Sequence, residues 1–473
     1  MSLYDSEFSF DDQQFLGDEK EIDAEIERCR QAIEDGNIYT SLETVEETLQ
    51  LCVDNDRNEE GLYFVEKLIE VAPYNSEHWF RKGVFLNGLF SFEEAVKSFE
   101  KALSLNPGDS ETLIDKAAAE ENLGRYTDAQ ESLDAALNSD PNDEEIWFNL
   151  GMVYQRAENF TKAVDSFLKA VELDETFAEA YYELGFCYEN LNELNKSLAA
   201  YDKFLESDPY SANGWYNRGV VLGKLNNLEK AINSYELAVA VREKFASAWF
   251  NMGNANADLG RLKKSLECFT KAKEIDPEDE AVLYNLGNIY EELGELNRAI
   301  QFYSMAIKIN DEYYEAYVAR GFCYESLDKF QSALKDFNKA IDLSFDSADA
   351  WYAKADLEYS LGKLNSAIHC YRTALKYEPD NFEIWFNLAE TLFEMGSWVD
   401  ALDAFENCNI LNPDDATSFY AKAKVNLILS RTKDAVDCLK VAFKLDPAIK
   451  GEFVKEYPDI KSSKLFKTLL GEF

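Results

Sequence analysis

The chain contains little histidine, proline or glycine, and this scarcity excludes several classes of protein. Of its 473 residues, only two are His, nine are Pro and 21 are Gly. So few Pro and Gly argue against a loop-rich fold. His78 and His369 lie far apart in the sequence and form no metal-spaced cluster. There is no phosphate-binding glycine loop and no Gly-x-Ser-x-Gly nucleophile motif. We therefore expect no enzyme activity, no cofactor and no metal site.

Paired cysteines and long apolar runs are also missing. The eight Cys are spread along the chain and none forms a Cys-x-x-Cys pair, so we predict neither a disulfide framework nor a zinc site. No apolar run approaches the ~18 residues of a membrane span. The first residues lack the basic and apolar regions of a secretory signal. These observations favour a cytoplasmic protein with buried free thiols.

The charge is strongly one-sided, with 90 acidic against 47 basic residues and a net charge of −43. Such a surface repels phosphate backbones and anionic membranes, so we expect no nucleic acid partner and no membrane insertion. It attracts basic partners. The alternative is that the charge only keeps a long protein in solution. With 46% hydrophobic and 14% aromatic residues, the chain has enough material for a core.

A period of 34 residues runs through most of the chain. A small residue recurs at every 34th position, with a bulky residue four positions before it. Residues 76–449 therefore divide into eleven repeats without insertion or deletion, and positions are numbered 1 to 34 from Ser76. The small residue occupies position 8 at Gly83, Ala117, Gly151, Gly185, Gly219, Gly253, Gly287, Gly321, Ala355, Ala389 and Ala423.

The other recurrent positions predict two helices in each repeat. Positions 4, 7, 8 and 11 share one helical face, and positions 20, 24 and 27 share another. Position 20 is Ala or Ser, and position 24 is Phe, Tyr or Leu. The small residues at positions 8 and 20 let the two helices approach closely, and the large residue at position 24 fills the space beside them. Position 32 is Pro in seven repeats, which ends the second helix. In the four repeats without that Pro, we expect the second helix to run longer.

Residues 147–154, Trp-Phe-Asn-Leu-Gly-Met-Val-Tyr, carry the first half of this pattern in full. The pattern resembles that of the tetratricopeptide repeat (TPR) family, specifically a long-array, bacterial-type scaffold protein. The resemblance covers 374 of the 473 residues. It implies an all-α fold, a right-handed superhelical solenoid of stacked antiparallel helix pairs. Each pair alone cannot bury its apolar faces, and stacking buries them. The implied function is non-catalytic binding of other proteins.

The segments outside the eleven repeats are predicted to close the ends of the solenoid. Residues 42–75 are interpreted as a degenerate twelfth repeat, and residues 19–41 as an N-terminal capping helix. Residues 1–18 are predicted to be an acidic disordered tail, or alternatively a docking motif. Residues 450–473 are predicted to be capping helices, or alternatively a surface for weak self-association.

The resemblance implies that positions 2, 5, 6, 9 and 12–13 of the first helices line a concave groove that faces a ligand. Position 5 is aromatic in nine repeats, position 6 is Asn in five, and position 2 is acidic in seven. These residues could also reflect only the family average. The densest run of aromatic residues and Asn lies in residues 215–288. The candidate partner-binding residues are Asn149, Tyr216, Asn217, Phe250, Asn251, Asn254, Tyr284, Asn285, Asn288 and Asn387.

The groove chemistry favours a protein or peptide partner that is basic, apolar or both. Asn donates to and accepts from a peptide backbone at once. The Lys residues with which some relatives clamp an acidic C-terminus are absent from positions 2 and 5. We therefore expect an extended or helical, basic and apolar segment to bind. The alternative function is a self-associating structural subunit of a larger assembly.

Overall fold

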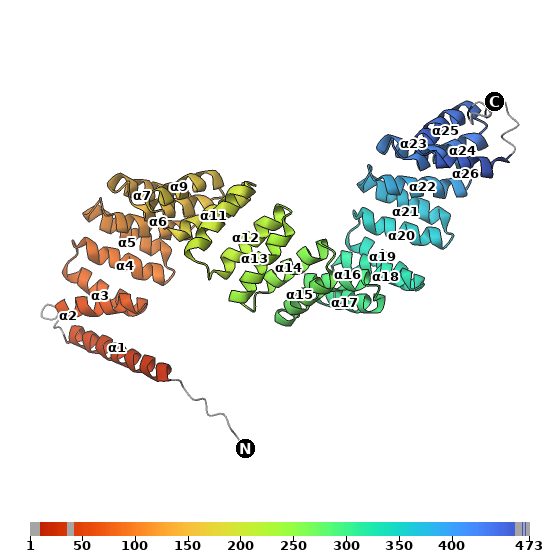
Figure 1. The fold of residues 1–473 in the computed structure, drawn as a ribbon. Helices are drawn as coiled ribbons and strands as arrows, with labels where there is room; N and C mark the ends of the chain where they lie inside the picture. Colours follow the sequence, from red (N-terminus) through yellow and green to blue (C-terminus); the bar gives the residue numbers. More distant parts are fainter. Residues whose placement is uncertain (1–9, 36–41, 459–465, 467–468, 470–473) are drawn as a thin grey trace, which may run out of the picture. The chain divides into compact units, whose positions relative to one another are not determined.

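The computed structural model describes residues 10–35, 42–458, 466 and 469, and the regular elements in these residues are all helices, α1 to α26 (Figure 1). Consecutive helices pack in pairs. The predicted all-α solenoid of helix pairs is therefore confirmed. The chain divides into two compact units, residues 1–242 and 243–473, and each is described by itself.

Each of the eleven repeats forms one helix pair. The first helices are α4 (Ser76–Gly88), α6 (Ser110–Asn122), α8 (Glu144–Arg156), α10 (Ala178–Asn190), α12 (Ala212–Lys224), α14 (Ala246–Asp258), α16 (Glu280–Glu292), α18 (Tyr314–Ser326), α20 (Ala348–Ser360), α22 (Phe382–Glu394) and α24 (Ala416–Ile428). The second helices are α5 (Phe92–Leu105), α7 (Tyr126–Ser139), α9 (Phe160–Leu173), α11 (Leu194–Ser207), α13 (Leu228–Val241), α15 (Leu262–Ile275), α17 (Leu296–Ile309), α19 (Phe330–Leu343), α21 (Leu364–Tyr377), α23 (Trp398–Leu411) and α25 (Thr432–Leu445).

Residues at the N-terminal end form α1 (Phe10–Glu34) and the pair α2 (Leu42–Asp54) and α3 (Asn58–Val71). The helix predicted as the N-terminal cap thus begins at Phe10, and residues 10–18 are helical where a disordered tail was predicted. The rest of that predicted tail, residues 1–9, lies outside the described residues, as do residues 36–41.

At the C-terminal end, α26 (Ala448–Glu456) covers the last helix pair. The Phe453 ring is fully buried, and its centroid lies 5.8 Å from that of Phe443 and 6.0 Å from that of Phe466. Together with Leu439 these rings belong to one apolar cluster. Whether residues 450–473 act as a cap stays a prediction. Most of residues 459–473 lie outside the described part of the chain.

A close contact between the two helices of a repeat explains the small residue at position 8. In all seven repeats with Gly there, an added Cβ would lie only 2.4–2.7 Å from the aromatic ring at position 24. Gly253, for example, faces the buried ring of Phe269. Interiors are too densely packed to absorb such an overlap without movement. The predicted close helix approach is therefore present.

The prediction of longer second helices where Pro is missing is wrong. The helices α9, α13, α17 and α19 precede these joints, and each has the same 14 residues as the other second helices. The residue after each helix leaves the helical conformation, as Asp174 does with φ −127° and ψ 101°. At two of these joints, the Trp at position 4 of the following repeat donates a hydrogen bond to a carbonyl group of the turn. One of them is Trp249, whose Nε1 lies 3.0 Å from the carbonyl oxygen of Glu243. Pro is thus not required for the turn.

The loop inside each helix pair requires one residue in the left-handed region. Position 15, and its equivalent Asp56 in the degenerate repeat, has a positive φ in all twelve pairs. Gly, Asn and Asp, which tolerate this conformation best, occupy nine of these positions. Phe90 is a bulky exception, with φ 59° and 81% of its surface exposed.

Within the described residues, all eight Cys are buried and free, in agreement with the expectation of buried thiols. Burial raises the pKa of Cys187 and Cys408 to about 12, so these thiols are unreactive. None of the described helices is long and apolar enough to cross a membrane.

Two glycines of α12 test the helix contact. An added Cβ at Gly219 would lie 2.5 Å from Cε1 of Tyr235, whereas one at Gly223 would lie 3.8 Å from the Tyr235 hydroxyl. Gly219→Leu should lower the free energy of unfolding by ~1–3 kcal/mol or more through overpacking. Gly223→Leu should be neutral or gain up to about 1 kcal/mol of helix propensity. Urea unfolding measures both, and equal effects would show that the contact does not limit residue size.

The loop conformation is tested by exchanging residues between two neighbouring loops. Phe90→Gly should raise stability by about 1 kcal/mol, because it removes a bulky side chain from the left-handed region. Gly124→Phe should lower stability by a similar amount, although an added Cβ at Gly124 (φ +72°) would meet nothing within 4 Å. Thermal unfolding of both variants measures these effects. A stabilising Gly124→Phe substitution would contradict the explanation.

Candidate functional site

The predicted binding surface, called here the first-helix face, consists of positions 2, 5, 6, 9 and 12–13 of the first helices. The aromatic rings at position 5 are half-buried on this face. In eight repeats the ring packs against the ring at position 24, with centroids 5.5–6.1 Å apart. The candidates Tyr216, Phe250 and Tyr284 are among these rings. They therefore support the core and present only part of each ring to a ligand.

Two of the candidate amides link consecutive repeats. Asn217 Nδ2 donates to the Tyr182 hydroxyl at 2.9 Å, and Asn387 Nδ2 donates to the Tyr352 hydroxyl at 3.0 Å. In both cases Asn at position 6 reaches the Tyr at position 5 of the preceding repeat. Each bond therefore fixes the register of two neighbouring first helices.

The candidates Asn149 and Asn285 also occupy position 6, but they donate to their own helix. Their Nδ2 atoms lie 2.9 Å from the carbonyl oxygens of Glu145 and Ala281. The residues at position 5 of the preceding repeats are Ile114 and Phe250, which have no hydroxyl. The residue 35 positions earlier thus decides which partner the amide takes.

The remaining candidate amides occupy positions 6 and 9 of α14 and α16. The Asn288 side-chain amide lies 2.7 Å from the Tyr303 hydroxyl. Asn251 and Asn254 are half-buried. The predicted strip in residues 215–288 includes residues of both compact units, so Tyr216 and Asn217 are described apart from the rest. Whether these residues form one binding strip stays a prediction.

Carboxyl groups with a raised pKa distinguish the first-helix face from the rest of the acidic surface. Among the described residues there are seven, six of them half-buried and Asp349 more exposed, and partial burial is the main cause of each shift. All seven lie on first helices at positions 2, 6, 9 or 12. Burial raises the pKa of Asp115 to about 6, and the charge of Glu111 acts in the same direction. The other six are Glu121, Glu183, Glu325, Asp349, Asp356 and Glu390.

Sequence reasoning did not identify these carboxylates, because 90 acidic residues gave no reason to prefer any of them. The available signal was their position in the repeat. A charged group that stays buried without full compensation is typical of a functional site. Within the first unit these groups lie on α6 and α10, and within the second on α18, α20 and α22.

One pocket of about 260 Å³ opens on the first-helix face of the second unit. Residues of α16, α18 and α20 line it, and they include the candidates Tyr284 and Asn288. Three are carboxylates and three are aromatic. Among the described residues that line it, none is basic. The lining residues are Tyr284, Asn288, Glu291, Tyr314, Glu315, Val318, Ala319, Phe322 and Asp349.

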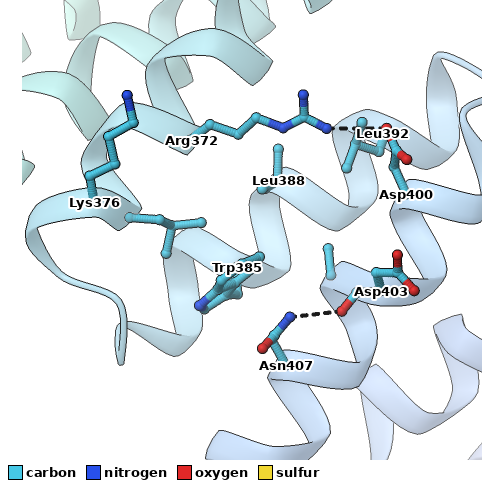
Figure 2. A pocket seen from close by; sticks show the side chains of 10 residues that line it. Arg372, Lys376, Trp385, Leu388, Leu392, Asp400, Asp403 and Asn407 are labelled. Atoms are coloured by element: carbon cyan, nitrogen blue, oxygen red, sulfur yellow. Dashed lines mark hydrogen bonds and ion pairs between the residues drawn. The ribbon is translucent and has the colours of Figure 1, made fainter.

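A pocket of different character lies between α21, α22 and α23, with a volume of about 340 Å³ (Figure 2). The Trp385 side chain lines this pocket, and both acidic and basic residues line it as well. Arg372 pairs with Asp400 at 3.1 Å, and Lys376 also lies at its edge. Similar pockets occur beside Trp79 and Tyr181. The pockets beside Trp385 and Trp79 are each lined by two acidic and two basic residues, and the one beside Tyr181 by three acidic residues and one Lys. All three therefore carry less uncompensated charge than the pocket on the first-helix face.

Comparisons with known proteins identify the repeat. Family models described as TPR repeat or tetratricopeptide repeat match residues 89–279, 281–347 and 355–396 together. Five models contribute to this coverage. The first matches residues 223–260 and 355–396, the second 89–150, and the third 144–177, 246–279 and 281–313. The fourth matches residues 166–199 and 200–233, and the fifth 314–347. No curated protein matches the chain.

Several solved structures are similar to parts of the chain. YrrB, described as a TPR protein with an unusual peptide-binding site, is 26% identical; the match covers 40% of this chain and 96% of that one, with a TM-score of 0.37. MamA is 24% identical over 36% of this chain and 94% of its own, with a TM-score of 0.34. The anaphase-promoting complex hetero-tetramer Cut9–Hcn1 is 16% identical over 90% and 95%, with a TM-score of 0.41.

The raised pKa of Asp115 predicts a pH-dependent stability. Between about pH 4 and pH 6 the folded state binds more protons than the unfolded state, so stability falls as pH rises through this window. Asp115→Asn should therefore raise the free energy of unfolding at about pH 7.5, by on the order of 1–2 kcal/mol. The gain should vanish near pH 4, where the wild-type carboxyl is protonated. Urea unfolding at both pH values measures the difference.

Glu131→Gln on α7 is the matched control, since it removes one negative charge from an exposed site on a second helix. An equal gain in this variant would show that net charge, and not burial, explains the effect. A gain that persists at about pH 4 would likewise contradict the burial of an ionised Asp115 carboxylate.

Proposed function

The chain belongs to the tetratricopeptide repeat family, and from this premise we propose that its first-helix face is a concave groove that binds an extended or helical, basic and apolar segment of another protein. A scaffold that binds proteins is the function that the repeats support, and members of the family are typically non-catalytic. The ten candidate residues and the buried carboxylates together form the proposed surface.

The carboxylates with raised pKa are the observation that carries this proposal. Partial burial raises the free energy of the ionised groups, and at Asp115, Glu325, Asp349 and Asp356 a neighbouring carboxylate adds to this cost. The other three, Glu121, Glu183 and Glu390, have a basic residue nearby that offsets part of it. A basic side chain that docks beside them supplies the missing opposite charge, so binding relieves a cost that the free protein already bears. Such a surface also repels acidic segments, and this adds to specificity.

The half-buried rings at position 5 supply the apolar part of the proposed surface. Because each ring is already held against the ring at position 24, it loses little conformational freedom when a ligand packs on it. Tyr182 and Tyr352 are held further by the amides of Asn217 and Asn387. The candidate amides therefore act mainly by ordering the groove, in addition to any bond they make to a ligand.

We also propose a reducing compartment, the cytoplasm, as the location of the protein. Eight buried free thiols are typical of such an environment. The charge of the chain is compatible with a soluble scaffold there.

A peptide selection tests the proposal. Random 12-residue peptides displayed on phage are selected on the full-length protein, and we expect enrichment of Arg and Lys together with apolar residues. Affinity is then measured for a variant with two neutralised carboxylates in each unit: Asp115→Asn, Glu183→Gln, Glu325→Gln and Glu390→Gln. The affinity should fall by roughly tenfold or more, and the wild-type affinity should fall as salt rises.

The control variant carries the same change in net charge on exposed residues of second helices. These substitutions are Glu100→Gln, Glu131→Gln, Glu267→Gln and Asp342→Asn. The control should bind the selected peptides within about twofold of the wild type, because distant exposed charges are screened. Absence of enriched peptides, or equal losses in both variants, would contradict a binding site on the first-helix face.

A further inference from the structure

The pocket between α16, α18 and α20 has walls that are already fixed in the free protein. The Tyr284 ring packs against the rings of Tyr303 and Tyr313, with centroids 5.6 and 5.1 Å apart. The Phe322 ring meets that of Phe337 edge-on at 5.3 Å. A flat group that enters the pocket therefore finds aromatic surfaces that need no rearrangement, and this favours binding.

The carboxylates of the pocket receive little compensation from the protein. Glu291 accepts a hydrogen bond of 2.7 Å from the Tyr303 hydroxyl. Neither Glu315 nor Asp349 forms an ion pair with any described residue. Burial, with the nearby charge of Glu378, raises the pKa of Asp349. The pocket is therefore short of positive charge.

The basic residue of α18 that lies nearest in sequence is not available to the pocket. Arg320 donates to both carboxylate oxygens of Asp336, at 2.7 and 2.9 Å, and to the Ser304 hydroxyl at 2.9 Å. This guanidinium is half-buried and held by three hydrogen bonds. It stays on the side of the second helices, so the charge that the pocket lacks has to come from outside.

We propose that this pocket binds the guanidinium group of one arginine side chain of the partner segment. The inference rests on the proposed function, since it names the residue that one part of the groove selects. A guanidinium is planar and stacks on aromatic rings such as Tyr284, Tyr314 and Phe322. Its forked donors fit two carboxylates at once, and Glu315 and Asp349 lie on neighbouring first helices at the edge of the pocket.

Arginine fits the pocket better than lysine for two physical reasons. The ammonium of lysine is a compact, strongly hydrated charge that makes no planar stack. Guanidinium is more weakly hydrated, so it enters a half-buried aromatic pocket at a lower desolvation cost. The pocket volume of about 260 Å³ has room for the group and part of its aliphatic stem.

A double-mutant cycle on a selected peptide tests the inference. The arginine of the peptide is replaced in turn by Lys, Gln and Ala, and the pocket is changed by Glu315→Gln with Asp349→Asn. With the wild-type protein, Arg→Ala should weaken binding roughly 10- to 100-fold, and Arg→Lys should also weaken it. With the pocket variant, the same peptide changes should have less than about a threefold effect. Calorimetry measures each affinity.

The matched control is Glu267→Gln with Asp342→Asn, which removes two exposed charges from α15 and α19 of the same unit. It should leave the full effect of the arginine intact. A peptide arginine whose contribution is unchanged in the pocket variant would overturn the inference, as would a preference for lysine. Both results would leave the proposed function standing, because peptides would still bind. A selection that enriches no peptide would instead overturn the proposed function and the pocket with it.

Discussion

The contact between position 8 and the residue at position 24 is the constraint on which the rest of each repeat depends. Where position 8 is Gly, the facing residue is always Phe or Tyr, and the ring lies where a Cβ would otherwise be. In the repeats with Ala117 and Ala423, position 24 is Leu133 or Leu439 and no ring faces the Ala. In the repeats with Ala355 and Ala389, position 24 is Tyr371 or Phe405, so these helix pairs hold one Cβ beside the ring. The residue at position 8 thus stays small in every repeat, and in seven of them no Cβ fits without movement of the ring.

The same contact shapes the surface that a ligand meets. The ring at position 24 supports the ring at position 5, so the proposed groove lies one residue layer above the core. In two of the repeats where position 24 is Tyr, its hydroxyl also reaches carboxylates of the first-helix face. Tyr303 donates to Glu291 at 2.7 Å, and Tyr371 donates to Asp356 at 2.5 Å. The choice between Phe and Tyr in the core therefore decides which surface carboxylates are held in place.

The period of 34 residues predicted the helix pairs and their close contact, because these depend on residues within one repeat. It did not predict where the second helix ends in the four repeats without Pro, because the turn forms there without that residue. The behaviour of the amides depends on two repeats. Asn217 and Asn285 both occupy position 6, yet one binds the preceding Tyr182 and the other its own helix, because Phe250 offers no hydroxyl. Comparison of each Asn with the residue 35 positions earlier would have predicted both arrangements.

The carboxylates could not be ranked from sequence for a further physical reason. An acidic side chain changes its pKa through burial, and burial at positions 6 and 9 depends on the bulk and register of the neighbouring repeats. Asp115 is half-buried between first helices, whereas an acid such as Glu131 on a second helix is exposed. Pattern positions keep the solenoid assembled and are nearly the same in every repeat, so they cannot distinguish one ligand from another. Selectivity therefore has to arise where a variable residue is half-buried by its neighbours, because a small change in sequence there alters both the shape and the charge that a partner meets. The pocket around Tyr284 and Glu315 is such a place.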